Sequence, residues 1–317
     1  MIDPVDSRDA AVLFSHTFLA DRRSSAFFDD IARAFRGAGY ATLAFDYSGH
    51  GRSGDEIITL STMVEDLRAA SGWLADQGHP RQIVHAHEFG ATVALEARPP
   101  SAVTYILSSP ALGPLSYDWT TIFSEVQLSD LERYGTTTIP DDSPSVRRHF
   151  TISKQTLADL SMADAEKLLT GLEVPTLITH DAADEETGLL DLTRAAFPLL
   201  PDGSRVEITS DDGPVDGADP APGALPPKTT LRSACLEWAR RWVPGRAQMG
   251  AQARTWTAAE GPGAHVGPGS AHDGTVAAAF PSPGAPSGAV GWPGPPSARP
   301  QLPRAAPFPA TGPTSRA

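Results

Sequence analysis

The sequence predicts an α/β fold in which helices cover both faces of a mostly parallel sheet. Short apolar runs typical of buried strands alternate with segments whose apolar residues recur at helical spacing. Strand–helix alternation of this kind is typical of parallel sheets, because parallel neighbours need crossover connections. A second observation concerns the C-terminal segment, which is rich in proline and glycine and shows neither period.

The first two strands flank a helix. The apolar run Ala10–His16 predicts a buried strand. Residues Arg23–Ala38 carry phenylalanine and isoleucine at helical spacing and end in glycines suited to a helix C-terminus. The run Ala41–Tyr47 predicts the second strand, and a glycine-rich loop follows it.

The next helix is expected to begin near Thr62, which could form a capping box with Glu65. Its apolar residues recur on one helical face. The run Gln82–Ala86 then predicts a third strand, which passes through His-Glu-Phe-Gly into a short helix over Phe89–Ala97. This strand–turn–helix unit is the sharpest connection that the pattern predicts.

Three further strands are expected at Ala102–Ser108, Pro175–His180 and Arg205–Thr209. Helices are predicted over Glu186–Leu199, after the fifth strand, and Thr229–Val243, after the sixth. The apolar face of the last helix includes the single cysteine, so that cysteine is expected to fill core space.

The chain is expected to divide into one domain, residues 1–245, and a tail, residues 246–317. Between the fourth and fifth strands, residues of about 110–174 lack clear strand signals and are expected to form a helical cap over the edge of the sheet. The tail is too rich in proline, glycine and alanine to bury a core that would offset the entropy of ordering, so it is predicted to be disordered.

Composition excludes several classes of protein. The net charge of −13 argues against binding nucleic acid or an anionic membrane through the surface field. No apolar run approaches the roughly 18 residues of a membrane span, and the first ten residues lack the features of a signal peptide. With one cysteine, Cys235, neither an intramolecular disulfide nor a thiolate metal cluster can form. We therefore expect a cytoplasmic protein.

Ligands of such sheets bind beyond the carboxyl ends of the strands, where this chain carries distinctive motifs. They are His16-Thr17-Phe18, the loop Phe45-Asp46-Tyr47-Ser48-Gly49-His50-Gly51-Arg52-Ser53-Gly54, the turn Ala86-His87-Glu88-Phe89-Gly90, and Asp184 after the fifth strand. On these motifs the chain resembles the α/β-hydrolases over about Val12–Val243. It also resembles, more narrowly, the hydrolase domains that are fused to osmotically induced, peroxidase-like domains.

The resemblance implies hydrolysis of an ester, thioester or amide through an acyl-enzyme, using a serine at a Gly-x-Ser-x-Gly elbow. It places Asp184 in the role of the triad acid and the backbone amides of Phe18 and Phe89 in the oxyanion hole. The nucleophile position, however, holds Glu88. The loop that carries the family histidine reads Ser-Asp-Asp-Gly-Pro over residues 210–214. Both halves of the proton-transfer pair are therefore missing.

Two interpretations of this pattern stay open. The favoured one is a hydrolase-family protein that is catalytically impaired or that binds a small ester-like ligand without converting it. The alternative is an active hydrolase that uses Glu88 as a carboxylate nucleophile, as aspartate serves in related dehalogenases and epoxide hydrolases. Ser108 and Ser109 end the fourth strand, but the sequence places no base beside them. No cofactor is expected.

The charged form of Glu88 is expected to occupy the oxyanion hole, because the helix N-terminus and the directed amides favour negative charge there. The side chains at the strand ends include residue types that bind metal ions: His16, His50, His87, His180, Glu88, Asp181 and Asp184. The histidines fall where ordinary α/β-hydrolases carry them to orient loops through hydrogen bonds. The sequence therefore predicts no metal.

Overall fold

The computed structural model describes residues 2–3, 7–22, 26–141, 146–209, 230–244 and 306–307. The loop 210–229 and nearly all of the predicted tail lie outside the described residues. Within the tail, Ala306–Pro307 forms the short strand β12, which pairs antiparallel with β7 (Leu115–Ser116).

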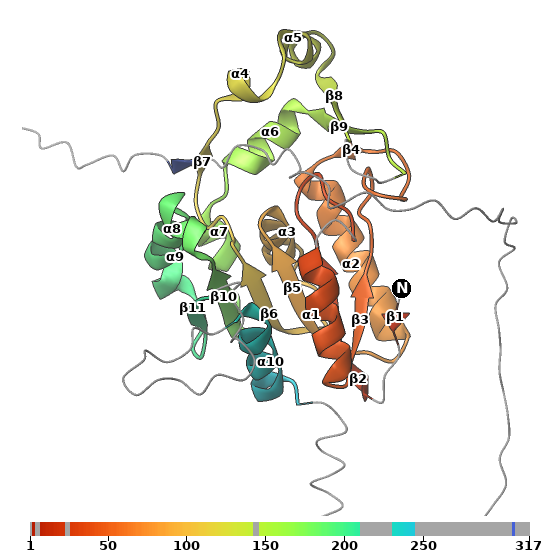
Figure 1. The fold of residues 1–317 in the computed structure, drawn as a ribbon, viewed down its shortest axis with the longest axis vertical. Coiled ribbons are helices and arrows are strands. Elements are labelled where there is room, and N and C mark those ends of the chain that lie inside the picture. Colours follow the sequence, from red (N-terminus) through yellow and green to blue (C-terminus); the bar gives the residue numbers. More distant parts are fainter. Residues whose placement is uncertain are drawn as a thin grey trace, which may run out of the picture.

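A seven-stranded sheet forms the centre of the molecule, in the order β1-β3-β2-β5-β6-β10-β11 (Figure 1). Every neighbouring pair is parallel except β1 with β3. The strands are β1 (Ile2–Asp3), β2 (Ser7–Ser15), β3 (Tyr40–Ala44), β5 (Arg81–His87), β6 (Ala102–Ser108), β10 (Thr176–His180) and β11 (Arg205–Ile208). The predicted α/β class is confirmed.

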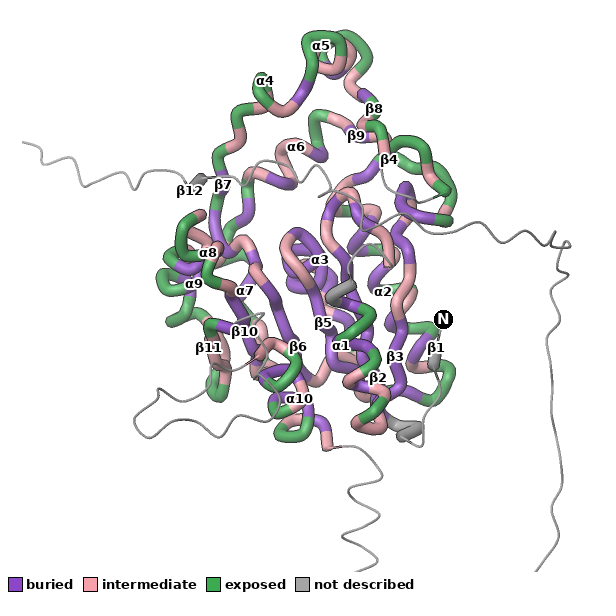
Figure 2. Tube along the Cα trace, viewed as in Figure 1, coloured by how far each residue is buried: buried purple, intermediate pink, exposed green. Residues whose placement is uncertain are grey.

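Helices cover both faces of the sheet, and most residues of its central strands are buried (Figure 2). On one face, α1 (Ala26–Gly37) and α10 (Leu231–Trp242) pack against alternate strand residues such as Val12 and Phe14. On the other, α2 (Leu60–Asp76) and α3 (Phe89–Ala97) pack against the residue between them, Leu13. Because successive strand residues point to opposite faces, the continuous apolar runs of the sequence feed two cores.

The insertion between β6 and β10 rises above one edge of the sheet (Figure 1). It contains the helices α4 (Trp119–Ile122), α5 (Glu125–Tyr134), α6 (Lys154–Ser161) and α7 (Ala165–Leu169). It also contains β8 (Thr136–Pro140) and β9 (His149–Ser153), which form a small sheet with β4 (Ile57–Ile58). The cap therefore contains helices, as predicted, together with short strands that were not predicted. Strand β8 is threonine-rich and partly exposed, whereas the alternation of the buried Phe150 and Ile152 in β9 is a strand signal that the sequence analysis missed.

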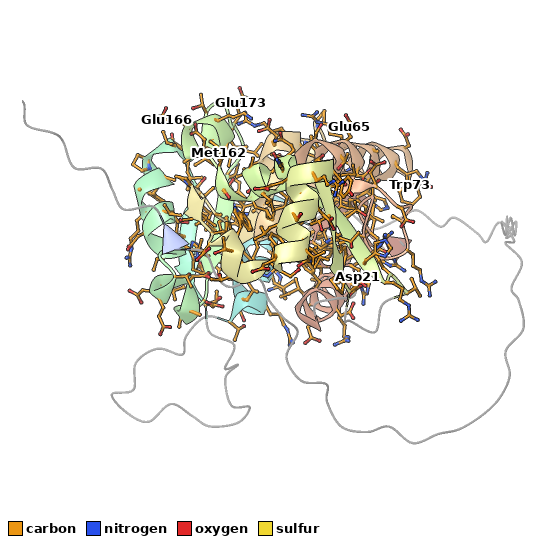
Figure 3. The ribbon with its side chains drawn as sticks, turned by 90° about the horizontal axis from the view of Figure 1, so that it is seen from above. Asp21, Glu65, Trp73, Met162, Glu166 and Glu173 are labelled. Atoms are coloured by element: carbon orange, nitrogen blue, oxygen red, sulfur yellow. The ribbon has the colours of Figure 1, made fainter. Side chains whose placement is uncertain are left out.

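Seen from above, the cap elements overlie the middle of the molecule, between Glu166 on one rim and Asp21 on the other (Figure 3). No described helix is long and apolar enough to cross a membrane.

Two helix boundaries differ from the sequence predictions. The capping box of α2 is formed by Thr59 and Thr62, one turn earlier than expected, since Thr59 accepts from the amide of Thr62. The helix predicted over Glu186–Leu199 is divided into α8 (Ala182–Glu186), α9 (Leu189–Ala196) and the 3₁₀ turn η1 (Phe197–Leu199). The break falls at Gly188, whose φ of 78° leaves the right-handed helical region.

Candidate active site

The turn from β5 into α3 has the backbone of a strained elbow. Glu88 lies at its apex with φ 49° and ψ −119°, a conformation that side chains with a Cβ atom rarely adopt. Two residues on, Gly90 lies so close to β2 that a Cβ atom there would be 2.4 Å from the carbonyl oxygen of Ser15. Glycine is therefore required at this approach, and the elbow expected from the sequence is present with glutamate at its tip.

The carboxylate of Glu88 does not take the position that the sequence analysis expected. Its Oε2 accepts a hydrogen bond from the hydroxyl of Thr17 at 2.9 Å, and its Oε1 lies 3.6 Å from Nε2 of His87. Among the described residues it accepts no bond from the amides of Phe18 or Phe89. The prediction that Glu88 fills the oxyanion hole is wrong, because the longer glutamate side chain reaches the nearby hydroxyl instead. The assignment of those two amides to an oxyanion hole stays a prediction.

The cap brings aromatic side chains to this carboxylate. Burial, with a smaller contribution from the negative charge of Glu88, raises the pKa of Tyr117 to about 12. Tyr117 stacks on Trp119 with ring centroids 4.7 Å apart, and Trp119 stacks on Phe123 at 5.7 Å. The side chain of Glu88 is nevertheless 45% exposed, so water reaches the elbow.

Asp184, the predicted triad acid, is fully buried and has its own partners. Its Oδ2 accepts from Nδ1 of His180 at 2.9 Å, and its carboxylate also accepts from the hydroxyl of Ser109. Burial alone would raise the pKa of Asp184, but the bonds from His180 and Ser109 outweigh it and hold this pKa below its usual range. The other ring nitrogen of His180 lies 2.9 Å from the hydroxyl of Thr193.

The two serines at the end of β6 do have titratable neighbours, which the sequence could not show. Ser109 contacts Asp184, and the Oγ of Ser108 lies 3.2 Å from Nε2 of His85. His85 and Ser108 are buried, and burial together with the charge of His87 lowers the pKa of His85 to about 3. His85 and Ser108 lie on the neighbouring strands β5 and β6, whereas Ser109 directly follows β6 and Asp184 lies in α8, after the next strand β10. The order of the strands in the sheet, which the sequence does not show, therefore brings these partners together.

The histidines of the two loops contact backbone atoms, as the family positions imply. Nδ1 of His16 lies 2.9 Å from the carbonyl oxygen of Thr17, and Nδ1 of His50 lies 3.0 Å from that of Ser48. Burial lowers the pKa of both imidazoles. Within the described ranges, no group of three His, Cys, Asp or Glu side chains is arranged to hold a metal ion. The residues 210–214, where relatives carry the triad histidine, lie outside those ranges.

Comparison with known proteins supports the geometry. The family described as serine aminopeptidase S33 matches residues 6–187. None of the curated proteins compared with the sequence matches it. Similar solved structures include the α/β-hydrolase GrgF from Penicillium sp. sh18, which is 17% identical, with 68% of this chain and 86% of that chain covered and a TM-score of 0.53.

Another is DcsB, solved with a substrate analogue, which is 18% identical, with 67% of this chain and 85% of that chain covered and a TM-score of 0.52. These two likenesses show the fold alone. The family match covers residues 6–187, more than half of the chain, and the strained elbow after β5 agrees with it: the chain belongs to the serine aminopeptidase S33 family of α/β-hydrolases.

Proposed function

We propose that this protein has lost serine-type hydrolysis and binds a small ester-like ligand in the cytoplasm without converting it. The observation that carries the proposal is the elbow itself. Its strained backbone presents Glu88 where relatives present the nucleophile, and Thr17 holds the carboxylate through a hydrogen bond. An ionised carboxylate at this tip repels the negative charge that develops on a carbonyl oxygen during acyl transfer.

The acid supports the same proposal. In a working triad the acid accepts a hydrogen bond from the base and orients it toward the nucleophile. Here Asp184 accepts from His180 and Ser109, and His180 is fully occupied between Asp184 and Thr193. Asp184 therefore already accepts hydrogen bonds from two neighbouring side chains, and both ring nitrogens of His180 have partners.

One observation favours the second candidate function, in which Glu88 attacks a ring carbon of an epoxide. The ring carbon–oxygen bond breaks as the ester intermediate forms, and the released alkoxide takes a proton from water. Nε2 of His87 lies 3.6 Å from Oε1 of Glu88, and Nδ1 lies 3.2 Å from the carbonyl oxygen of Ser108. Because a carbonyl oxygen only accepts, Nδ1 carries the hydrogen, and Nε2 of the neutral ring can accept a proton from water. That water would release the ester by attacking its carbonyl carbon.

The experiment compares the full chain with Glu88→Gln and Glu88→Ser, using short-chain p-nitrophenyl esters, epoxides and a fluorophosphonate probe. If the protein has lost serine-type hydrolysis, the wild type and Glu88→Gln should show the same background rate of substrate hydrolysis. The fluorophosphonate probe should label neither protein. Glu88→Ser alone should also stay at background, because the loop 210–214 holds no histidine to take the proton of the serine. Binding of the ester-like ligand is measured by its non-hydrolysable ketone analogues, which should quench tryptophan fluorescence saturably.

The second candidate predicts the opposite result. Turnover of the wild type would then fall in both Glu88→Gln and His87→Gln, and mass spectrometry of the quenched reaction would show an adduct on Glu88. The control is Glu125→Gln, which removes an exposed carboxylate from the first turn of α5, away from the elbow.

A further inference from the structure

A pocket of about 460 Å³ lies where the loop after β3 meets the start of β9, away from the elbow residues. Its walls come from the segments 51–55 and 146–149, and its charged side chains are Arg52, Asp55, Arg147, Arg148 and His149. None of the elbow residues lines this pocket, so an inference about it does not depend on the proposed function.

One arginine fixes the wall of the pocket. The side chain of Arg147 is only 8% exposed, and its guanidinium donates to the carboxylate of Asp55 at 2.7 Å. The same group also donates to the carbonyl oxygen of Ser53, which lies on the opposite segment. Arg147 therefore joins the two walls, and the positions of the neighbouring residues are held by a buried cation.

The other cationic side chains that line the pocket have no partner in the described part of the chain. The guanidinium groups of Arg52 and Arg148 and the ring of His149 form no hydrogen bond or ion pair there, and all three residues are exposed. Three guanidinium groups against the single carboxylate of Asp55 leave an excess of two positive charges. In a chain of net charge −13, unpaired cations gathered at one pocket create a local field that attracts anions.

We propose that this pocket binds a phosphate monoester. The guanidinium fork pairs with phosphate and with carboxylate oxygens in a bidentate manner, so it selects oxyanions. The excess of two positive charges matches the dianion of a phosphate monoester better than the single charge of a carboxylate. The volume leaves space for an organic group beyond the phosphate, and His149 adds a ring nitrogen that can donate a hydrogen bond.

The test is isothermal titration of the full chain with phenyl phosphate, inorganic phosphate and benzoate. We expect saturable one-to-one binding of phenyl phosphate, weaker binding of inorganic phosphate and the weakest binding of benzoate. Arg52→Gln and Arg148→Gln should each raise the Kd for phenyl phosphate by about tenfold, the scale of a lost charge-assisted bond. The matched control is Arg194→Gln, which removes an exposed guanidinium from α9 and should leave the Kd unchanged.

A variant that should bind phenyl phosphate more tightly controls for the loss of binding that unfolding alone would cause. Asp55→Asn removes the one carboxylate of the pocket, whose side chain is largely exposed, and should tighten phenyl phosphate binding by about threefold at low salt. Absence of saturable binding to the wild type would overturn the proposal. So would equal affinity of the wild type and the two arginine variants, or binding of benzoate as tight as that of phenyl phosphate.

Discussion

The backbone of Glu88 predicts an unusual result of substitution by glycine. At φ 49° and ψ −119°, any residue with a Cβ atom is strained, at a cost of roughly 1–3 kcal/mol. Glu88→Ala removes the hydrogen bond to Thr17 but keeps the strain, whereas Glu88→Gly removes both. Glycine loses roughly 0.5–1 kcal/mol more chain entropy on folding than alanine. The net difference should favour Glu88→Gly over Glu88→Ala by about 1 kcal/mol.

The measurement is urea unfolding of both variants, followed by tryptophan fluorescence and far-ultraviolet circular dichroism. Glu132, exposed within α5, supplies the matched control pair. There the order should reverse, because glycine inside a helix costs about 1 kcal/mol relative to alanine. If Glu88→Gly were less stable than Glu88→Ala, as at position 132, the elbow would not be strained and the argument for a retained nucleophile turn would fail.

Two further predictions concern buried polar groups. Burial lowers the pKa values of His50 and His85 to about 3, so the unfolded chain alone binds these protons below about pH 6.5. The free energy of unfolding should be highest above that pH and fall toward pH 3 by about 1.4 kcal/mol per pH unit for each histidine. A urea midpoint that stays constant between pH 7 and 5 would contradict this. Thr104→Val should cost about 1–3 kcal/mol in the same assay, because the buried indole N–H of Trp238 loses its acceptor at 2.8 Å. Thr104→Ser keeps the acceptor and should cost less; equal stability of the two variants would refute the assignment.

The strands of the main sheet could be predicted from sequence because each is a continuous apolar run. The runs Ala102–Ser108 and Gln82–Ala86 correspond to β6 and the middle of β5. The cap strand β8 could not, since Thr136–Pro140 is threonine-rich and its pairing with β9 is decided by tertiary contacts. Strand β9 carries a short alternation of Phe150 and Ile152 that was missed. A local sequence pattern identifies strands that are buried on both faces of the sheet. It misses partly exposed strands whose formation depends on pairing with a neighbouring strand.

The candidate site also has features that could be predicted from the sequence and features that could not. The strained turn at residues 86–90 could be predicted from its motif, and so could the place of Asp184 directly after β10, although its role as triad acid stays a prediction. The hydrogen-bond partners of the side chains could not be predicted from motifs. Whether Glu88 reaches an amide or the hydroxyl of Thr17 depends on about an ångström of side-chain length, and the partnership of Ser109 with Asp184 depends on the register of β6 against β10.

The strained elbow persists with glutamate at its tip because the framework around it, and not the side chain at position 88, determines its shape. Gly90 is in close approach to the end of β2, where the hydroxyl of Ser15 donates to its carbonyl oxygen at 2.9 Å and also bonds to Tyr47. The amide of Glu88 donates to the carbonyl oxygen of Ser108 on β6, which fixes the other side of the turn. These contacts use only backbone atoms of the elbow. The side chain at the tip can therefore change while the backbone geometry stays the same, so an elbow of this shape shows the fold and does not by itself show which chemistry the residue at its apex performs.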